Sequence, residues 1–293
     1  MIRMTFRPVA FTVNVITSLS LLVAPLSSAM AQTASDERWY QVEVTVFAHN
    51  NAFIERELWP MEVLSEVLPR ATRPLDSLMG ILDLPDWSVL SPYSGEPEER
   101  TELAAPLQES DFRLPDFERD AFLALPASEQ GFSDTNRALT AAGSYRVLYH
   151  NAWRQPMRNA SQSVPVWIQG GGEYVLEGLP RHELEGTLVF RFNPGRDRVV
   201  LDARLWLSEF SSLAPEQTLK LPELPPSVTE KLNAAVEDIS GRQWYLNAVI
   251  PVVSSREMRS NEFHYLDHPA VGIVVYVFPY EVPPQPLTPP SLF

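Results

Sequence analysis

The chain contains no cysteine among its 293 residues, and this absence limits its chemistry. Without cysteine there is no disulfide bond, no thiolate metal ligand and no thiol nucleophile. A lipoprotein needs a cysteine at its cleavage site, so lipid anchoring by that route is not expected. Stability must therefore come from a hydrophobic core, and an apolar fraction of 45% is enough to form one.

Common catalytic and nucleotide-binding motifs are also missing. The sequence has no G-x-S-x-G, no P-loop and no H-E-x-x-H. Three consecutive glycines occur at 170–172, but neither a lysine nor a predicted helix follows, so a flexible turn is expected there rather than a phosphate site. We predict no catalytic residue, no metal ligand and no cofactor.

Positive charge is scarce. The chain has 23 Lys and Arg against 37 Asp and Glu, which gives a formal net charge of −14. Such a protein repels nucleic acid and anionic lipid at long range, so nucleic acid is not an expected partner.

The first 31 residues have the pattern of a secretory signal peptide. Arg3 and Arg7 precede an apolar run from Val9 to Val23, and an A-x-A sequence follows at 29–31. The run is short and includes polar residues, and no later stretch is long and apolar enough to span a bilayer. We expect cleavage before Gln32, a periplasmic location, no transmembrane segment after cleavage, and a net charge of −16 once the two arginines are removed.

Apolar and polar residues alternate in six stretches, and this period of two predicts half-buried strands. The stretches are Trp39–Phe47, Tyr145–Trp153, the two arms of Arg181–Phe210 with a turn at 193–196, and the two halves of Gly241–Tyr280 with a turn at 267–269. Hairpin connections favour antiparallel pairing.

Helices are predicted only in short pieces. Ser133 to Gly143 and Ser227 to Gly241 each begin with an N-cap residue and end at glycine. Recurring prolines break the segment at about 53–130 and the tail at 283–293. The prediction is an α+β fold with a single, mostly antiparallel β-sheet, a few short covering helices and long Pro-rich loops. Residues 32–282 are predicted to form one domain that includes the Pro-rich insertion at about 53–130.

The segment from Arg256 to His268 is polar on both faces, which does not suit a strand that only completes a sheet. We therefore predict a binding surface for a glycan or a partner protein. Its candidate residues are Arg259, Asn261, Glu262, His264 and Tyr265. The alternative is a solvated hairpin tip whose charges pair with one another.

A second candidate surface is Trp153-Arg154-Gln155, where an aromatic ring lies next to hydrogen-bonding side chains. Trp153 could stack on a sugar ring while Arg154 and Gln155 bond its hydroxyls. The alternative is that the tryptophan packs in the core.

Two further clusters are better explained by structure than by chemistry. His264, Asp267 and His268 are zinc-ligand types, but histidines four residues apart converge only on a helix, so a hydrogen-bonded turn is expected. Glu183 and Glu185 share a strand face, and we expect that face to be solvated rather than to line a cleft.

Four blocks of sequence resemble the CsiV family, the periplasmic cell-shape-integrity proteins of Gram-negative bacteria. They cover about half of the chain after residue 31, in the order of the family. The blocks are RWYQVEVTVFAHNN with the following ELWP, YRVLYHNAWRQP, EGTLVFRF with VVLDARLWL, and REMRSNEFHYLDHPAVGIVV.

The resemblance implies a non-enzymatic role. It implies binding to peptidoglycan and support of a class A penicillin-binding protein through its outer-membrane lipoprotein activator, of the LpoA type. It supplies no ligand residues to carry over. The alternative function left open by the residues is a periplasmic hydrolase with a non-standard carboxylate site.

Overall fold

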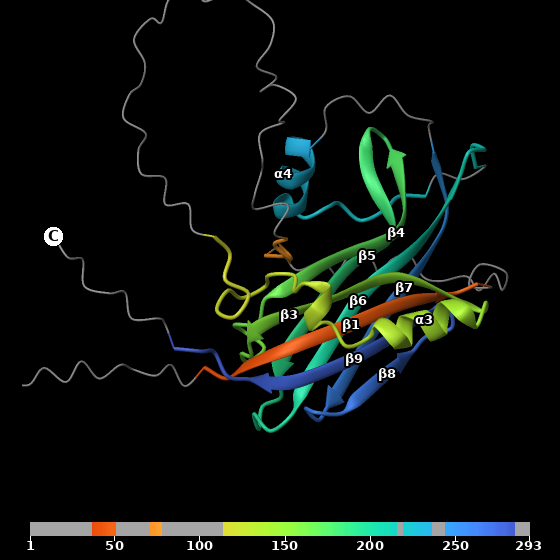
Figure 1. The fold of residues 1–293 in the computed structure, drawn as a ribbon. Helices are drawn as coiled ribbons and strands as arrows, with labels where there is room; N and C mark the ends of the chain where they lie inside the picture. Colours follow the sequence, from red (N-terminus) through yellow and green to blue (C-terminus); the bar gives the residue numbers. More distant parts are fainter. Residues whose placement is uncertain (1–36, 51–70, 78–113, 216–218, 236–243, 285–293) are drawn as a thin grey trace, which may run out of the picture. The chain divides into compact units, whose positions relative to one another are not determined.

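The computed structural model describes residues 37–50, 71–77, 114–215, 219–235 and 244–284. The predicted signal peptide, most of the Pro-rich insertion and most of the Pro-rich tail lie outside these residues. The described part is mostly β-sheet (Figure 1). No helix in these ranges is long and apolar enough to cross a membrane.

The strands form two sheets. The first, called sheet A, has the strand order β3-β1-β9-β8, and the second, sheet B, has the order β2-β4-β5-β6-β7. All neighbours are antiparallel except the short β2, which pairs with β4 in parallel. The bounds in sheet A are β1 Trp39–His49, β3 Tyr145–Pro156, β8 Phe263–Asp267 and β9 Val271–Tyr280. The bounds in sheet B are β2 Arg73–Pro74, β4 Pro165–Leu176, β5 Leu179–Phe192, β6 Val199–Ser211 and β7 Tyr245–Met258.

The expectation of a single sheet was wrong. The two halves of the segment at 241–280 were interpreted as partners, but β7 pairs with β6 while β9 pairs with β1 and β8. The chain passes from sheet B to sheet A between Met258 and Phe263. Alternation shows that a strand has one buried face but not which sheet it joins, and two sheets packed face to face give the same pattern. The predicted turn at 267–269 is confirmed, because it joins β8 to β9.

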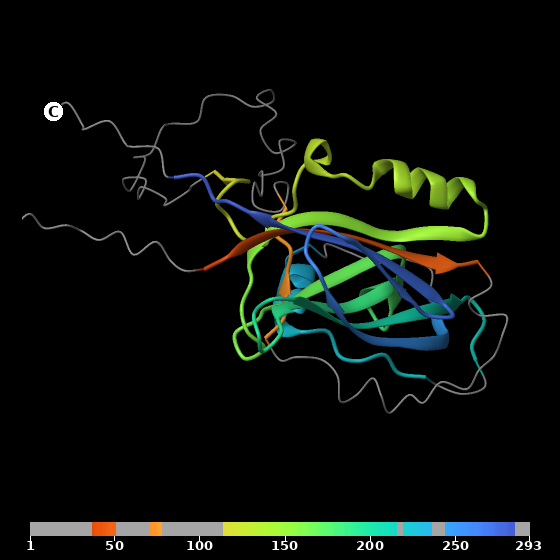
Figure 2. The same ribbon diagram turned by 90° about the horizontal axis from the view of Figure 1, so that it is seen from below.

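The main core lies between the two sheets (Figure 2). Sheet A contributes the apolar face of β1 and β9, and sheet B contributes that of β5 and β6. The residues buried there include Val42, Val44, Val46, Ile273, Val275, Leu184, Leu188, Phe190, Leu201 and Leu205. The inward alternation predicted for both arms of the 181–210 hairpin is thus confirmed.

The outer faces are covered in different ways. Helix α3 (Ser133–Ala141) and the 3-10 turn η2 (Ala127–Glu129) lie over β1 and β3, and α3 is seen on the outer side of sheet A in Figure 2. Helix α4 (Pro226–Ala235) belongs to the outer side of sheet B, where Val228 packs with Trp167 and Trp206 in a second apolar cluster. Helix α3 falls within the range predicted from the sequence, and α4 begins one residue before its predicted start.

Candidate functional site

Trp153, Arg154 and Gln155 lie inside the protein. Trp153 is 0% exposed and its indole N–H donates to Gln155 at 2.8 Å. The Arg154 guanidinium donates to the Gln41 side chain at 3.0 Å and to the Phe117 carbonyl at 2.7 Å, and it forms an ion pair with Glu129. These contacts attach the segment before α3 to sheet A, so the three side chains are not exposed as a stacking platform.

The candidates between 259 and 265 lie at the turn after β7 and on β8, and most are exposed. The turn is fixed to sheet A because the Asn261 N–H donates to the Val277 carbonyl at 2.8 Å. Asn261 itself has φ +63°, a left-handed conformation that asparagine tolerates better than most residues. Arg259 lies 3.8 Å from Glu262, and the His264 ring contacts the Arg259 carbonyl at 2.9 Å. The structure therefore brings this group together.

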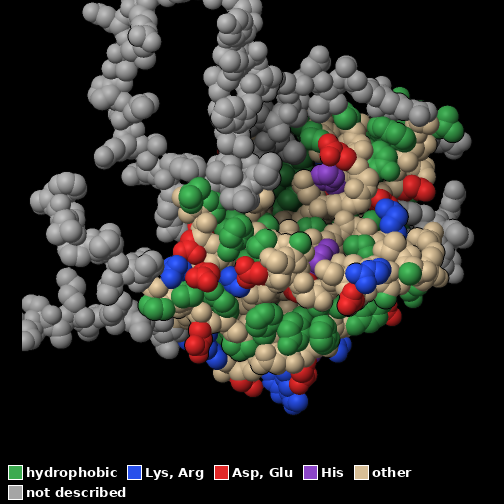
Figure 3. All heavy atoms as spheres, in the orientation of Figure 1, with side chains coloured by type: hydrophobic (Ala, Val, Ile, Leu, Met, Phe, Trp, Pro, Cys, Tyr) green, Lys and Arg blue, Asp and Glu red, His purple; other side chains and the backbone are tan. Residues whose placement is uncertain are grey.

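β8 and β9 carry aromatic side chains on their outer side, and we call Phe263, Tyr265, Tyr276 and Phe278 the aromatic face. Phe263 is 70% exposed and stacks on Tyr276 with ring centroids 4.6 Å apart. Tyr276 contacts Phe278 at 5.4 Å, and Tyr265 is 45% exposed. Hydrophobic side chains form a band in Figure 3 over the region where Figure 1 draws β8 and β9.

The aromatic face is held rigidly from below. Leu266, Ile273 and Val275, which alternate with it along the strands, are buried in the core. Phe132, at the start of α3, packs against Phe263 with centroids 5.8 Å apart. Of the aromatic face, Phe263 and Tyr265 fall within the segment predicted from the sequence, and only Tyr265 was named as a candidate residue. The signal that would have found the others is the odd–even pattern of β9, where 271, 273, 275 and 277 point inward and 276 and 278 outward.

The Tyr265 hydroxyl is fixed as a hydrogen-bond donor. It donates to the Asp267 carboxylate at 2.7 Å. Partial burial, this hydrogen bond and the negative charge of Asp267 together raise the pKa of Tyr265, so the hydroxyl stays protonated at neutral pH.

The histidines near this turn have separate partners. His264 bonds to the Arg259 carbonyl, and His268 Nδ1 accepts from the Ala270 N–H at 3.3 Å. Among the described residues, no group of three or more His, Asp or Glu side chains is placed to hold a metal ion.

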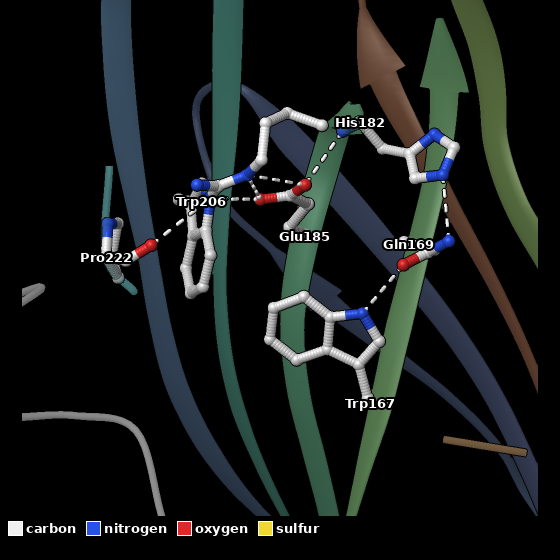
Figure 4. Close-up of polar contacts among 7 residues, drawn as sticks. Trp167, Gln169, His182, Glu185, Trp206 and Pro222 are labelled. Carbon is white, nitrogen blue, oxygen red and sulfur yellow. Dashed lines mark hydrogen bonds and ion pairs between the residues drawn. The ribbon is translucent and has the colours of Figure 1, made fainter. Parts of the chain in front are cut away.

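Glu185, expected on a solvated face, is instead buried in a polar network on the outer side of sheet B (Figure 4). Its carboxylate accepts from the Arg181 guanidinium at 2.7 Å, the His182 N–H at 2.8 Å and the Trp206 indole at 3.2 Å. Trp167 continues the network by donating to Gln169 at 2.9 Å. Trp167 and Trp206 pack with α4 over this surface. The Glu185 carboxylate is fully hydrogen-bonded by its donors, so its role is structural.

Glu183 is also mostly buried, and it pairs with Arg146 of sheet A at 2.7 Å. The expectation of a solvated carboxylate pair was therefore wrong. The two carboxylates have different partners and share no open cleft. The physical reason is that polar residues on a strand are buried wherever a distant segment supplies donors, which the alternation pattern does not reveal.

A comparison with family models finds one that matches residues 15–280, and its description is "Peptidoglycan-binding protein, CsiV". Neither a curated protein nor a solved structure matches the chain.

Proposed function

The chain belongs to the CsiV family of peptidoglycan-binding proteins, and from this premise we propose that it binds the glycan strands of peptidoglycan through the aromatic face. The observation that carries this assignment is the Phe263–Tyr276 stack, which presents a ring that is 70% exposed on a rigid sheet. A single exposed apolar residue is ordinary, but several adjacent aromatic side chains on one sheet face indicate a binding surface.

The chemistry suits a glycan. Sugar rings have apolar C–H faces that pack on aromatic rings, and their hydroxyls bond to nearby polar groups. Asn261 and Glu262 lie in the turn directly before Phe263 and can supply such bonds. Stacking does not depend on opposite charge, which matters because the chain carries a net charge of −14.

The shape suits a polymer. The aromatic face lies on the last two strands of sheet A, and β8 is an edge strand. A long strand can lie across such a face without threading into a closed site. Because the sheet is already ordered by its ladder and core, little conformational entropy is lost on binding.

We further infer a non-enzymatic, periplasmic role in supporting a class A penicillin-binding protein through its LpoA-type lipoprotein activator. The family resemblance supports this role, and the exposed turn at 259–262 offers a polar surface next to the aromatic face. Glu183 and Glu185 do not support the hydrolase alternative, because both carboxylates are bonded to arginine.

The experiment is co-sedimentation of the purified protein with peptidoglycan sacculi. We expect Phe263→Ala combined with Tyr276→Ala to weaken binding about 30-fold, if each ring contributes about 1 kcal/mol. The control is Leu213→Ala combined with Val253→Ala, which removes exposed apolar side chains outside the aromatic face and should bind normally. Equal binding by both double variants, with unchanged melting temperatures, would show that the aromatic face is not the glycan site.

A further inference from the structure

A pocket of about 240 Å³ lies where the end of β1 and the start of β3 meet strands of sheet B. We call it the corner pocket. The residues used below are His49 from β1, Arg146 from β3, Tyr174 from β4, Glu183 from β5, and Ser208 and Phe210 from β6. Both sheets therefore contribute to its lining, although it lies outside the aromatic face.

The three glycines at 170–172 lie next to two residues of this pocket, Tyr174 and Glu183. They interrupt the β4–β5 register between Gly170 and Glu173, so they form a bulge and not the flexible turn that was expected. A Cβ on Gly170 would lie 2.1 Å from the Leu148 carbonyl oxygen of sheet A. A Cβ on Gly171 would lie 2.8 Å from the Glu183 carboxylate, and one on Gly172 2.8 Å from the Tyr174 ring. The glycines thus let two pocket residues pack directly against the backbone.

One ion pair joins the two sheets at the pocket. Arg146 binds Glu183 through two of its nitrogens, and the Gly172 N–H donates to the same carboxylate at 3.2 Å. The charges of Arg146 and Glu183 therefore cancel. A guanidinium has five N–H donors, so Arg146, which is half exposed, keeps further donors for a ligand.

Two polar atoms in the lining have no hydrogen-bond partner within the described part of the chain. They are the Ser208 hydroxyl oxygen and His49 Nε2, and both are buried. Ser208 is completely buried, so its hydroxyl belongs to the wall of the pocket and not to the protein surface. Buried polar atoms are nearly always bonded in native proteins, so an unbonded pair in one pocket points to a ligand.

We propose that the corner pocket binds a single neutral sugar residue. The uncharged groups left for the ligand are a serine hydroxyl, an imidazole nitrogen and the Tyr174 hydroxyl, and each can donate or accept a hydrogen bond. Sugar hydroxyls have the same dual character. Tyr174 and Phe210, stacked at 4.4 Å, add an apolar wall for the C–H face of the ring.

Charge and size exclude other ligand classes. The Arg146 charge is neutralised and Glu209 adds a carboxylate to the lining, so an anion is disfavoured. An ammonium group would need a carboxylate with open oxygens, but those of Glu183 are bonded to Arg146 and to the Gly172 N–H, and one oxygen of Glu209 is bonded to Asn247. The volume is below the roughly 300–1,000 Å³ of pockets that hold drug-sized ligands, so one ring fits and a chain does not.

A pocket that holds one sugar ring selects the end of a glycan strand, whereas the aromatic face can bind along the length of the strand. This extension to strand ends rests on the proposed function, while the sugar class follows from the pocket alone. The natural probe is N-acetylglucosamine, a neutral amino sugar, and its β-1,4 dimer.

The experiment is an NMR titration of ¹⁵N-labelled protein with N-acetylglucosamine, with the dipeptide D-Ala-D-Ala as the zwitterionic comparison. We expect shifts at the backbone amides of His49, Tyr174 and Ser208 with the sugar and none with the dipeptide. Ser208→Ala should weaken sugar binding roughly fivefold, the usual effect of one lost hydrogen bond. Shifts with the dipeptide alone, or no shifts with either, would overturn the proposal.

The matched control is Thr187→Val. Thr187 also has a buried hydroxyl without a partner among the described residues, but it does not line the corner pocket. The Thr187→Val variant should bind the sugar like the wild type. An equal loss of sugar binding in Thr187→Val and Ser208→Ala would overturn the assignment. Sacculus co-sedimentation separates the two proposals, since the Phe263→Ala, Tyr276→Ala variant should lose sacculi yet keep the N-acetylglucosamine shifts.

Discussion

Arg181 and Glu185, four residues apart on β5, form an ion pair that is almost completely removed from solvent. The guanidinium reaches the carboxylate at 2.7 Å, and the Glu185 side chain is 1% exposed. Removing one partner of a buried pair leaves an uncompensated charge, which typically costs about 3–5 kcal/mol. We therefore expect Glu185→Gln to lower the free energy of unfolding by about that amount in urea titrations.

The control for this change is Glu173→Gln, which alters an exposed glutamate on the neighbouring strand β4. It should change the unfolding free energy by less than about 0.5 kcal/mol. Equal stability of the two variants would mean that Glu185 contributes no more than a surface carboxylate.

Glu185 also shows what could not be predicted from the sequence. Alternation predicted most of the strands and their inward faces, because burial of apolar side chains has a period of two. It could not show that Glu185 and Glu43 are buried, since their donors come from segments that are remote in sequence or from backbone N–H groups. Nor could it separate one sheet from two, because both arrangements bury one face of each strand.

Glu43 provides a prediction for the dependence of stability on pH. Burial alone would raise the pKa of Glu43, but hydrogen bonds from His150 at 2.8 Å and from the backbone N–H groups of Gly131 and Phe132 outweigh it and lower the pKa below 4.5. The ionised form is thus favoured in the folded state. Its stabilisation is complete above the unfolded pKa and is lost as the pH falls through the lower, folded pKa.

The test compares melting temperatures of the wild type and Glu43→Gln between pH 7 and pH 3. We expect the variant to be less stable at neutral pH and the difference to shrink below about pH 4.5, as the wild-type carboxylate becomes protonated. A difference that stays constant over this range would show that the charge of Glu43 is not the stabilising feature.

Leu205 tests the assignment of the core between the sheets. It is fully buried on β6 in the main core. We expect Leu205→Asp to abolish folding, because burying an unpaired carboxylate costs several kcal/mol, a large share of the stability of a typical domain. Leu213→Asp, at a position that is 77% exposed, should melt like the wild type in circular dichroism. Cooperative, wild-type-like melting of Leu205→Asp would place this face of β6 outside the core.

One candidate site could be proposed from the sequence and the other could not, and the reason is again physical. The residues at 259–265 could be proposed from the sequence because a strand with two polar faces is not explained by packing. The corner pocket was missed because its lining comes from five strands, and the β4–β5 register beside it is interrupted by the bulge at 170–172. A glycine triplet shows that the backbone comes close to something, but not what it approaches.

The turn after β7 yields the last prediction, which concerns the protein partner. Arg259 and Asn261 are exposed, and the Arg259–Glu262 contact at 3.8 Å is a surface pair worth under about 1 kcal/mol. Alanine at 261 would be strained at φ +63°, so the informative variant combines Arg259→Ala with Asn261→Gly, which keeps that conformation accessible. We expect its melting temperature to stay close to that of the wild type while binding to the LpoA-type lipoprotein weakens in a pull-down. Sacculus binding through the aromatic face should weaken much less than lipoprotein binding, since the rings remain and only the Asn261 amide beside them is lost. Loss of stability with unchanged lipoprotein binding would instead make this turn a structural element.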